Sequence, residues 1–303
     1  MNNFQESDVV FVADMFLEDY GGGAERTTAA LFETAVYKTS KVKSSELTQE
    51  LIQGGVNKFW VFFNYRQMDH NLIPTIVANC NYAVVEYDYK FCHYRSIDLH
   101  KIENDDDCNC QDQQIGKIIS AFLHGSEHIF WMSEKQSQIY QEKFPFLKHN
   151  KQTVLSSIFS VDDLEYIERL SKVREKNKWN ETHWAVIDGN SWIKGINESI
   201  ERVNTEFPES TVEVLGGLSY YDLLKSLSEF HGLSFQPLGG DTCPRTVIEA
   251  KLLGLELLLN ENVQHKNESW FKGSRDEIAS YLLGRHQVFW NTITNFLERD
   301  ITL

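Results

Sequence analysis

Short apolar segments alternate with helix-forming segments along the whole chain, and this alternation restricts the fold more than any other feature. It is typical of parallel strands joined by crossover helices. In the first half we expect strands at 9–13, 58–63, 83–86, 129–131 and 153–155, with helices at 24–34, 72–78, 114–122 and 134–144. This half therefore predicts one doubly wound domain.

The second half repeats the pattern with fewer strands. We expect strands at 184–187, 212–215, 233–236 and 255–259, with helices at 196–206, 221–227 and 245–253. The polar, charged stretch 171–180 is typical of a helix end and connector, and places a domain boundary near 160–180. The tail, 285–299, has apolar residues at helical spacing and should dock on an apolar surface. The chain is thus predicted to be α/β, with two Rossmann-like domains facing a cleft.

The segment 239–250 marks a loop that leads into a helix. Pro244 suits a first helical turn because its missing N–H would be unpaired there. Gly254 falls where a left-handed C-terminal cap is expected. Free N–H groups near Thr246 and Val247, together with the helix dipole, would face an anion at this N-terminus. A diphosphate fits that position.

Two carboxylates lie on either side of this junction, Asp241 before the helix and Glu249 within it. Carboxylates accept hydrogen bonds from vicinal hydroxyls, so one can hold a hexose and the other a ribose, with the diphosphate between them. The spacing favours a nucleotide-sugar over a bare phosphate. The alternative is an N-cap aspartate with a solvated helix glutamate.

Two further motifs suggest phosphate contacts. Gly22 and Gly23 belong to a glycine loop that follows the first expected strand and opens a helix. Glycines let backbone N–H groups approach a phosphate closely. A dinucleotide turn or a plain structural turn is the alternative, although the full G-x-G-x-x-G register is not evident. Lys194-Gly195 follows the first strand of the second half.

Together, the glycine loop, Lys194-Gly195, the Asp241/Glu249 pair and the C-terminal helix resemble the retaining GT-B glycosyltransferases of glycosyltransferase family 4. The resemblance covers most of the chain. It implies an acceptor-side domain at 1–165, a nucleotide-sugar domain at 166–284, and a C-terminal helix, 285–303, that crosses back to the first domain.

The resemblance also implies roles for individual residues. Lys194 would contact the donor phosphates and stabilise the leaving diphosphate. Asp241 stands where the family's E-x7-E motif has its first glutamate, and would contact the hexose, while Glu249 would hold the ribose. Asn190 occupies the place of a family arginine. Arg245 is the candidate substitute because a guanidinium binds phosphate in a bidentate way, with a surface salt bridge as the alternative.

The family often has a His-Asp pair after a central strand of the first domain, whereas this chain has Tyr87-Asp88. Glu86, Asp88 or His93 could orient the acceptor instead, and Asp88 is the candidate aid to catalysis. Helix capping is the alternative role for such an aspartate. By resemblance, attack occurs from the front face and the leaving phosphate takes the acceptor's proton. Catalysis would then depend on positioning and electrostatic stabilisation.

An acidic, solvent-exposed loop is the first interpretation of the region that contains Cys92-His93, His100 and Cys108-Asn109-Cys110. The reason is its three consecutive aspartates at 105–107. A zinc site is the alternative, although C-x-C replaces C-x2-C and the fourth ligand is uncertain. We find no D-x-D motif typical of a metal-bound donor. We therefore assign no metal-binding residues and no cofactor, and expect metal-independent transfer.

The formal net charge of −15 argues against a nucleic-acid partner, which needs a concentrated positive field. No apolar run is long enough for an integral membrane segment, and the first residues lack signal-peptide features. We expect a cytoplasmic protein whose five cysteines are reduced.

Three functions remain open. The first is transfer of a hexose, with retention, from a UDP- or GDP-sugar to a glycan, protein or small-molecule acceptor. The second is a sugar-nucleotide-binding protein of the same fold without transfer activity. The third is a sugar-nucleotide epimerase.

Overall fold

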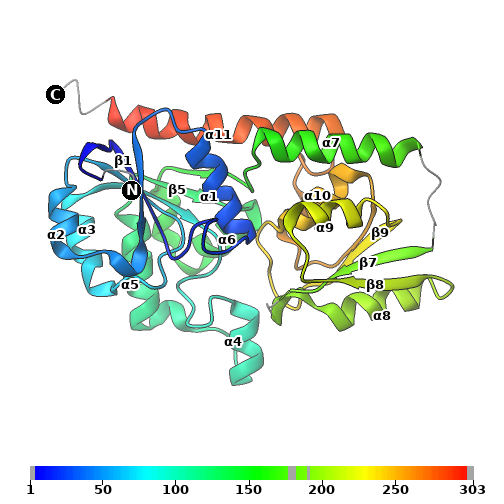
Figure 1. The fold of residues 1–303 in the computed structure, drawn as a ribbon. Helices are drawn as coiled ribbons and strands as arrows, with labels where there is room; N and C mark the ends of the chain where they lie inside the picture. Colours follow the sequence, from blue (N-terminus) through cyan, green and yellow to red (C-terminus); the bar gives the residue numbers. More distant parts are fainter. Residues whose placement is uncertain (1–3, 177–181, 190–191, 299–303) are drawn as a thin grey trace. The chain divides into compact units, whose positions relative to one another are not determined.

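The computed structural model describes residues 4–176, 182–189 and 192–298, and divides into two compact units. Unit 1 comprises residues 1–158 and 284–303, and unit 2 comprises residues 159–283. Each unit contains one parallel sheet with helices (Figure 1). The division between residues 158 and 159 precedes α7 (Val161–Lys176), which packs against α10 (Arg245–Leu253) within unit 2.

Unit 1 has a six-stranded parallel sheet in the order β2-β1-β3-β4-β5-β6. Three of these strands, β1, β3 and β5, are buried at every residue, as expected when helices cover both faces of a parallel sheet. The strands are β1 (Val9–Ala13), β2 (Thr39–Lys43), β3 (Phe59–Phe62), β4 (Asn81–Glu86), β5 (His128–Trp131) and β6 (Gln152–Val154). The helices are α1 (Gly23–Glu33), α2 (Gln49–Gly54), α3 (Ile73–Asn79), α4 (Ile97–Asn104), α5 (Gln114–His124) and α6 (Glu134–Lys143).

Unit 2 has a four-stranded parallel sheet in the order β10-β9-β7-β8, with α8 on one face and α10 on the other (Figure 1). Its strands are β7 (His183–Ile187), β8 (Thr211–Leu215), β9 (Gly232–Phe235) and β10 (Glu256–Leu259). The remaining helices are α8 (Ile196–Glu206) and α9 (Tyr220–Leu227). A side chain at Gly232 would place its Cβ 2.3 Å from the buried indole of Trp184, so the two strands can pair here only with glycine.

The last helix, α11 (Arg275–Leu297), begins before the expected start at residue 285 and contributes to both units. Its unit 1 part docks through aromatic residues, as its spacing predicted. Trp290 stacks on Phe11 with ring centres 5.8 Å apart, and Phe296 stacks on Phe59 at the same separation. Apolar ring contacts thus hold this part of α11 against the sheet of unit 1.

Short 3₁₀ helices complete the fold: η1 (Phe4–Glu6), η2 (Ser44–Glu46), η3 (His70–Leu72), η4 (Cys110–Asp112), η5 (Pro145–His149), η6 (Trp192–Lys194) and η7 (Gln264–Asn267). Within the described ranges, no helix is both long enough and apolar enough to cross a membrane.

Candidate functional site

The strand order of unit 2 reverses between β7 and β9, and two of the predicted site residues meet there. Chain connections leave β7 and β9 in opposite directions across the sheet, and ligands of open α/β sheets bind beyond the carboxyl ends of the strands at such a point. Lys194 ends η6, after β7, and Asp241 follows β9. The Lys194 Nζ atom lies 3.2 Å from Oδ2 of Asp241, with 28% and 16% of the two side chains exposed. Residues from two separate motifs therefore form one ion pair.

Backbone contacts fix both members of this pair. Gly195 has φ 59°, and a Cβ there would lie 1.9 Å from the carbonyl oxygen of Gln236, so the turn after Lys194 requires glycine. The N–H of Asp241 donates to the carbonyl of Asn262 at 2.9 Å, and the carbonyl of Asp241 accepts from the N–H of Gln264 at 3.0 Å. The main chain is thus fixed at Asp241 and directly after Lys194, and the ion pair itself orients the two side chains.

Arg245 and Glu249 lie four residues apart on α10 and belong to a buried polar network. Nη2 of Arg245 lies 3.0 Å from Oδ2 of Asp163, and its Nε lies 3.4 Å from Oε1 of Glu249. The Tyr220 hydroxyl donates to the same glutamate oxygen at 2.9 Å, and the Phe159 ring centre lies 3.8 Å from the guanidinium carbon. Burial disfavours the charge of Arg245, but Tyr220, Glu249 and Asp163 outweigh it and raise the pKa of the guanidinium.

Arg245 and Glu249 are more deeply buried than residues that bind a phosphate from solvent would be. Only 4% of the Arg245 side chain and 2% of the Glu249 side chain are exposed. Arg245 is therefore neither a surface salt-bridge residue nor an open anion ligand as placed here. The predicted roles of both residues stay predictions. Sequence reasoning missed Asp163, which is 82 positions from Arg245, and Tyr220, which is 25 positions away, because no local pattern links them.

α10, which carries Arg245 and Glu249, begins and ends where the sequence predicts. It starts directly after Pro244, and its C-cap, Gly254, has the expected left-handed conformation with φ 85°. We expected the N–H of Val247 to be free, but it donates to the Pro244 carbonyl at 3.2 Å. Thr246, in the same first turn, is partly exposed. Asn190 lies outside the described residues.

In unit 1, the predicted glycine loop leads directly into α1, with Gly22 as N-cap and Gly23 as the first helical residue. A Cβ on Gly22 would lie 2.4 Å from a carboxyl oxygen of Glu25 and 2.6 Å from the Tyr20 ring. Glu25 is buried, and burial raises its pKa. A side chain at Gly22 would therefore have to displace Glu25 and Tyr20, and the phosphate role of Gly22 and Gly23 stays a prediction.

A second charged group follows β4, which lies inside the sheet of unit 1. Asp88 accepts a hydrogen bond from Nε of Arg95 at 2.9 Å and lies 3.4 Å from Nζ of Lys90. Burial opposes its charge, but Lys90 and Arg95 lower the pKa of Asp88, so its carboxylate is ionised with 23% of the side chain exposed. Glu86 is fully buried between Lys90 and Tyr65, and burial raises its pKa. Of these two carboxylates, only Asp88 can meet a ligand without rearrangement.

The cysteine-containing region is partly as predicted. The three aspartates at 105–107 are exposed, as expected of an acidic loop. In contrast, His100 and the three nearby thiols are buried together, and they could hold a metal ion. His93 is exposed and lies outside this group. All five cysteines are free thiols.

The fold is similar to that of solved GT-B proteins. A UDP-forming α,α-trehalose-phosphate synthase from Burkholderia xenovorans aligns with a TM-score of 0.53 and 8% identity, over 97% of this chain and 95% of that chain. UGT2 of Phytolacca americana, complexed with UDP-2-fluoroglucose and pterostilbene, aligns with a TM-score of 0.39 and 10% identity, over 96% and 94% of the two chains. No protein family and no curated protein matches the sequence. The chain therefore has the GT-B fold, an α/β architecture with two parallel-sheet domains.

Proposed function

We propose that this protein is a retaining glycosyltransferase that binds a nucleotide-diphosphate sugar through unit 2. The observation that carries the proposal is the Lys194–Asp241 pair at the point where the strand order of unit 2 reverses. It combines a cation for a diphosphate with a carboxylate for sugar hydroxyls. The GT-B fold supports the proposal, and the similar trehalose-phosphate synthase is itself described as UDP-forming.

In this proposal, the Lys194 ammonium faces the diphosphate and stabilises the charge that develops as the leaving group departs. Asp241 accepts hydrogen bonds from hydroxyls of the hexose. Glu249 is the acceptor for the ribose hydroxyls, and because only 2% of its side chain is exposed, this contact requires a rearrangement that opens the carboxylate to the donor. Arg245 and Tyr220 already bond to Glu249, so they hold its carboxylate in one orientation. Arg245 thus acts as a positioning residue, and phosphate contact would require it to leave Asp163.

The proposed reaction breaks the bond between the anomeric carbon and the donor phosphate, and forms a bond from the acceptor oxygen on the same face of the sugar. The acceptor's hydroxyl proton goes to the departing phosphate oxygen, so no protein base is needed. Asp88 is ionised and partly exposed, and can accept a hydrogen bond that orients the acceptor hydroxyl. The family resemblance favours a hexose from a UDP- or GDP-sugar, and leaves glycan, protein and small-molecule acceptors open.

Calorimetric and thermal-shift titrations against UDP-, GDP-, ADP- and dTDP-sugars test the proposal, first without metal and then with magnesium, because a ligand of the folded state raises stability. We expect one selective donor that binds without metal. Glu249→Ala should lose this binding, whereas Glu229→Ala, at an exposed position of the same unit, should keep it. Absence of binding by every donor would contradict the proposal.

Product analysis with the selected donor then separates the alternatives. Retention predicts that the anomeric configuration of the product equals that of the donor, as read by NMR coupling constants. An inverted product would refute the retaining mechanism. Donor binding without transfer or hydrolysis would indicate a sugar-nucleotide-binding protein, and an isomerised donor in the absence of acceptor would indicate an epimerase.

A further inference from the structure

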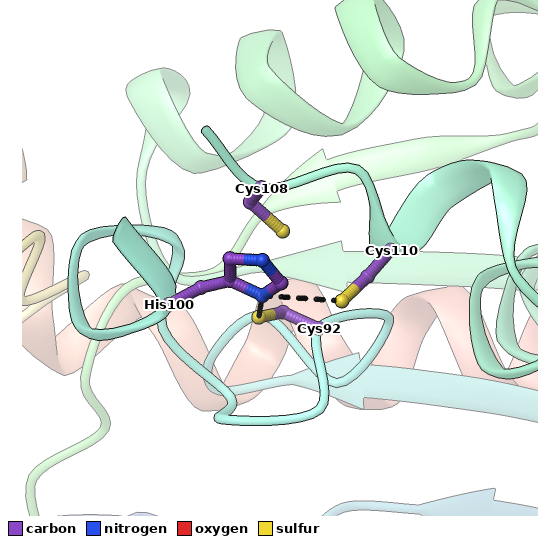
Figure 2. A group of neighbouring side chains, drawn as sticks. All are labelled: Cys92, His100, Cys108 and Cys110. Atoms are coloured by element: carbon purple, nitrogen blue, oxygen red, sulfur yellow. Dashed lines mark hydrogen bonds between the residues drawn. The ribbon is translucent and has the colours of Figure 1, made fainter. Parts of the chain in front are cut away.

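A group of four buried side chains in unit 1 has no role in the proposed transfer. Figure 2 shows Cys92, His100, Cys108 and Cys110 pointing toward one common centre. Cys92 lies in the turn after β4, His100 in α4, Cys108 in the loop after α4, and Cys110 at the start of η4. The four residues are at most 8% exposed, so their thiols and imidazole face each other and not solvent.

Two histidine–sulfur separations in this group match those of a tetrahedral metal site. Nδ1 of His100 lies 3.7 Å from Sγ of Cys92 and 3.4 Å from Sγ of Cys110. All four donor atoms lie within 4.8 Å of one another. Zinc bonds of about 2.3 Å to sulfur and about 2.0 Å to nitrogen, at tetrahedral angles, require donor separations of about 3.5–3.8 Å. The observed histidine–sulfur separations thus need almost no adjustment to accept the ion.

The surrounding chain holds these donors in place. A Cβ on Gly116 of α5 would lie 2.2 Å from the carbonyl oxygen of Cys110, so this glycine lets η4 pack directly on the helix. Lys143 of α6 donates from Nζ to the carbonyl oxygen of Cys108 at 3.2 Å. The Tyr94 ring meets the His100 ring edge to face, with centres 5.6 Å apart. Each contact orients a ligand-bearing segment from outside the group, as residues that surround the ligands do in metal sites.

We propose that Cys92, His100, Cys108 and Cys110 form a structural zinc site. Three thiolates and one imidazole are a donor set of structural zinc, and four protein ligands leave no open position for substrate or water. On binding, the three thiol protons pass to solvent and no oxidation state changes. The exposed aspartates at 105–107 add negative charge next to the site without belonging to it.

The ion would stabilise the segment between β4 and α5. This segment has few apolar anchors along α4, where His100 is the only buried side chain. The same segment carries Arg95, which bonds to Asp88. Zinc would therefore fix the loop that holds the ionised carboxylate in place. This inference is independent of the donor site in unit 2, because it depends only on residues of unit 1.

Metal analysis of the intact protein, expressed in zinc-supplemented medium and purified without chelator, tests the proposal. We expect one zinc per chain in the wild type and in Cys80→Ser, since Cys80 lies outside the group. Cys110→Ser and His100→Ala should lose the bound zinc. Zinc contents far below stoichiometry in the wild type, or unchanged contents in both ligand variants, would overturn the site.

Spectroscopy on the wild-type protein tests the zinc site even if the ligand variants fail to fold. Replacement of zinc by cobalt(II) should give the intense visible bands of a tetrahedral site and thiolate charge-transfer bands in the near ultraviolet. X-ray absorption at the zinc edge should show three sulfur ligands and one nitrogen ligand. A six-coordinate oxygen shell, or a disulfide among these three cysteines found by mass spectrometry of the purified protein, would refute the proposal.

Discussion

Replacing Arg245 by methionine should destabilise unit 2 strongly, because the change leaves two carboxylates buried without their cation. Nη2 lies 3.0 Å from Asp163, and Nε lies 3.4 Å from Glu249, whose side chains are 8% and 2% exposed. One such contact corresponds to about 5 kcal/mol of Coulomb attraction at an effective dielectric constant of about 20, before desolvation is subtracted. Removing one partner of a buried pair costs about 3–5 kcal/mol in measured cases. We expect Arg245→Met to lower the stability of unit 2 by about 3–5 kcal/mol.

Hydrogen exchange resolved by mass spectrometry is the suitable assay, because two units need not unfold together and a single free energy of unfolding is then undefined. Amides of β7 and β9 should lose protection in Arg245→Met, while those of β1 and β3 should not. Arg169→Met is the matched control, since its pair with Glu165 is 3.9 Å long and exposed. It should change stability by less than about 1 kcal/mol. Equal effects of the two substitutions would refute the reasoning.

Three further results are expected. Gly195→Ala should destabilise unit 2 more than Gly217→Ala, because both residues have positive φ but only Gly195 would clash with a carbonyl; equal losses in urea unfolding would contradict this. Burial lowers the pKa of His128 from 6.5 to about 4, so the unfolded chain binds more protons between these values. Stability should therefore fall by up to about 3 kcal/mol as pH drops through this window, and the fall should be smaller in His128→Gln. Donor affinity should be the same with and without added magnesium in a buffer that contains no chelator, and a requirement for magnesium would refute metal-independent binding.

The strand–helix alternation was sufficient to predict most of the fold. Nine of the ten strands formed by the described residues were expected, and α8 and α10 have the predicted bounds. β2 was missed because it is an edge strand whose residues alternate between buried and partly buried positions, and its sequence, Thr39–Lys43, contains two lysines. Such a strand lacks the apolar run that marks strands buried on both faces.

Helical spacing accounts for part of the candidate site, although the predicted ligand roles of its residues stay predictions. Arg245 and Glu249 are four positions apart, which places both side chains on one face of α10, and the structure has them in contact. Asp163 and Tyr220 reach this network only through tertiary packing, so sequence spacing could not identify them. For the same reason, the fourth ligand of the cysteine group remained uncertain until α4 placed His100 beside the thiols.

Isothermal titration of the preferred nucleotide-sugar to Lys194→Ala tests the central claim most directly. Loss of a charged hydrogen-bond donor to phosphate should weaken binding by about 1.5–3 kcal/mol, or roughly 10- to 150-fold. Lys225→Ala, at an exposed position of α9, should bind the donor as the wild type does. If Lys194→Ala keeps wild-type affinity, the diphosphate does not bind at the Lys194–Asp241 pair and the proposed donor site is wrong.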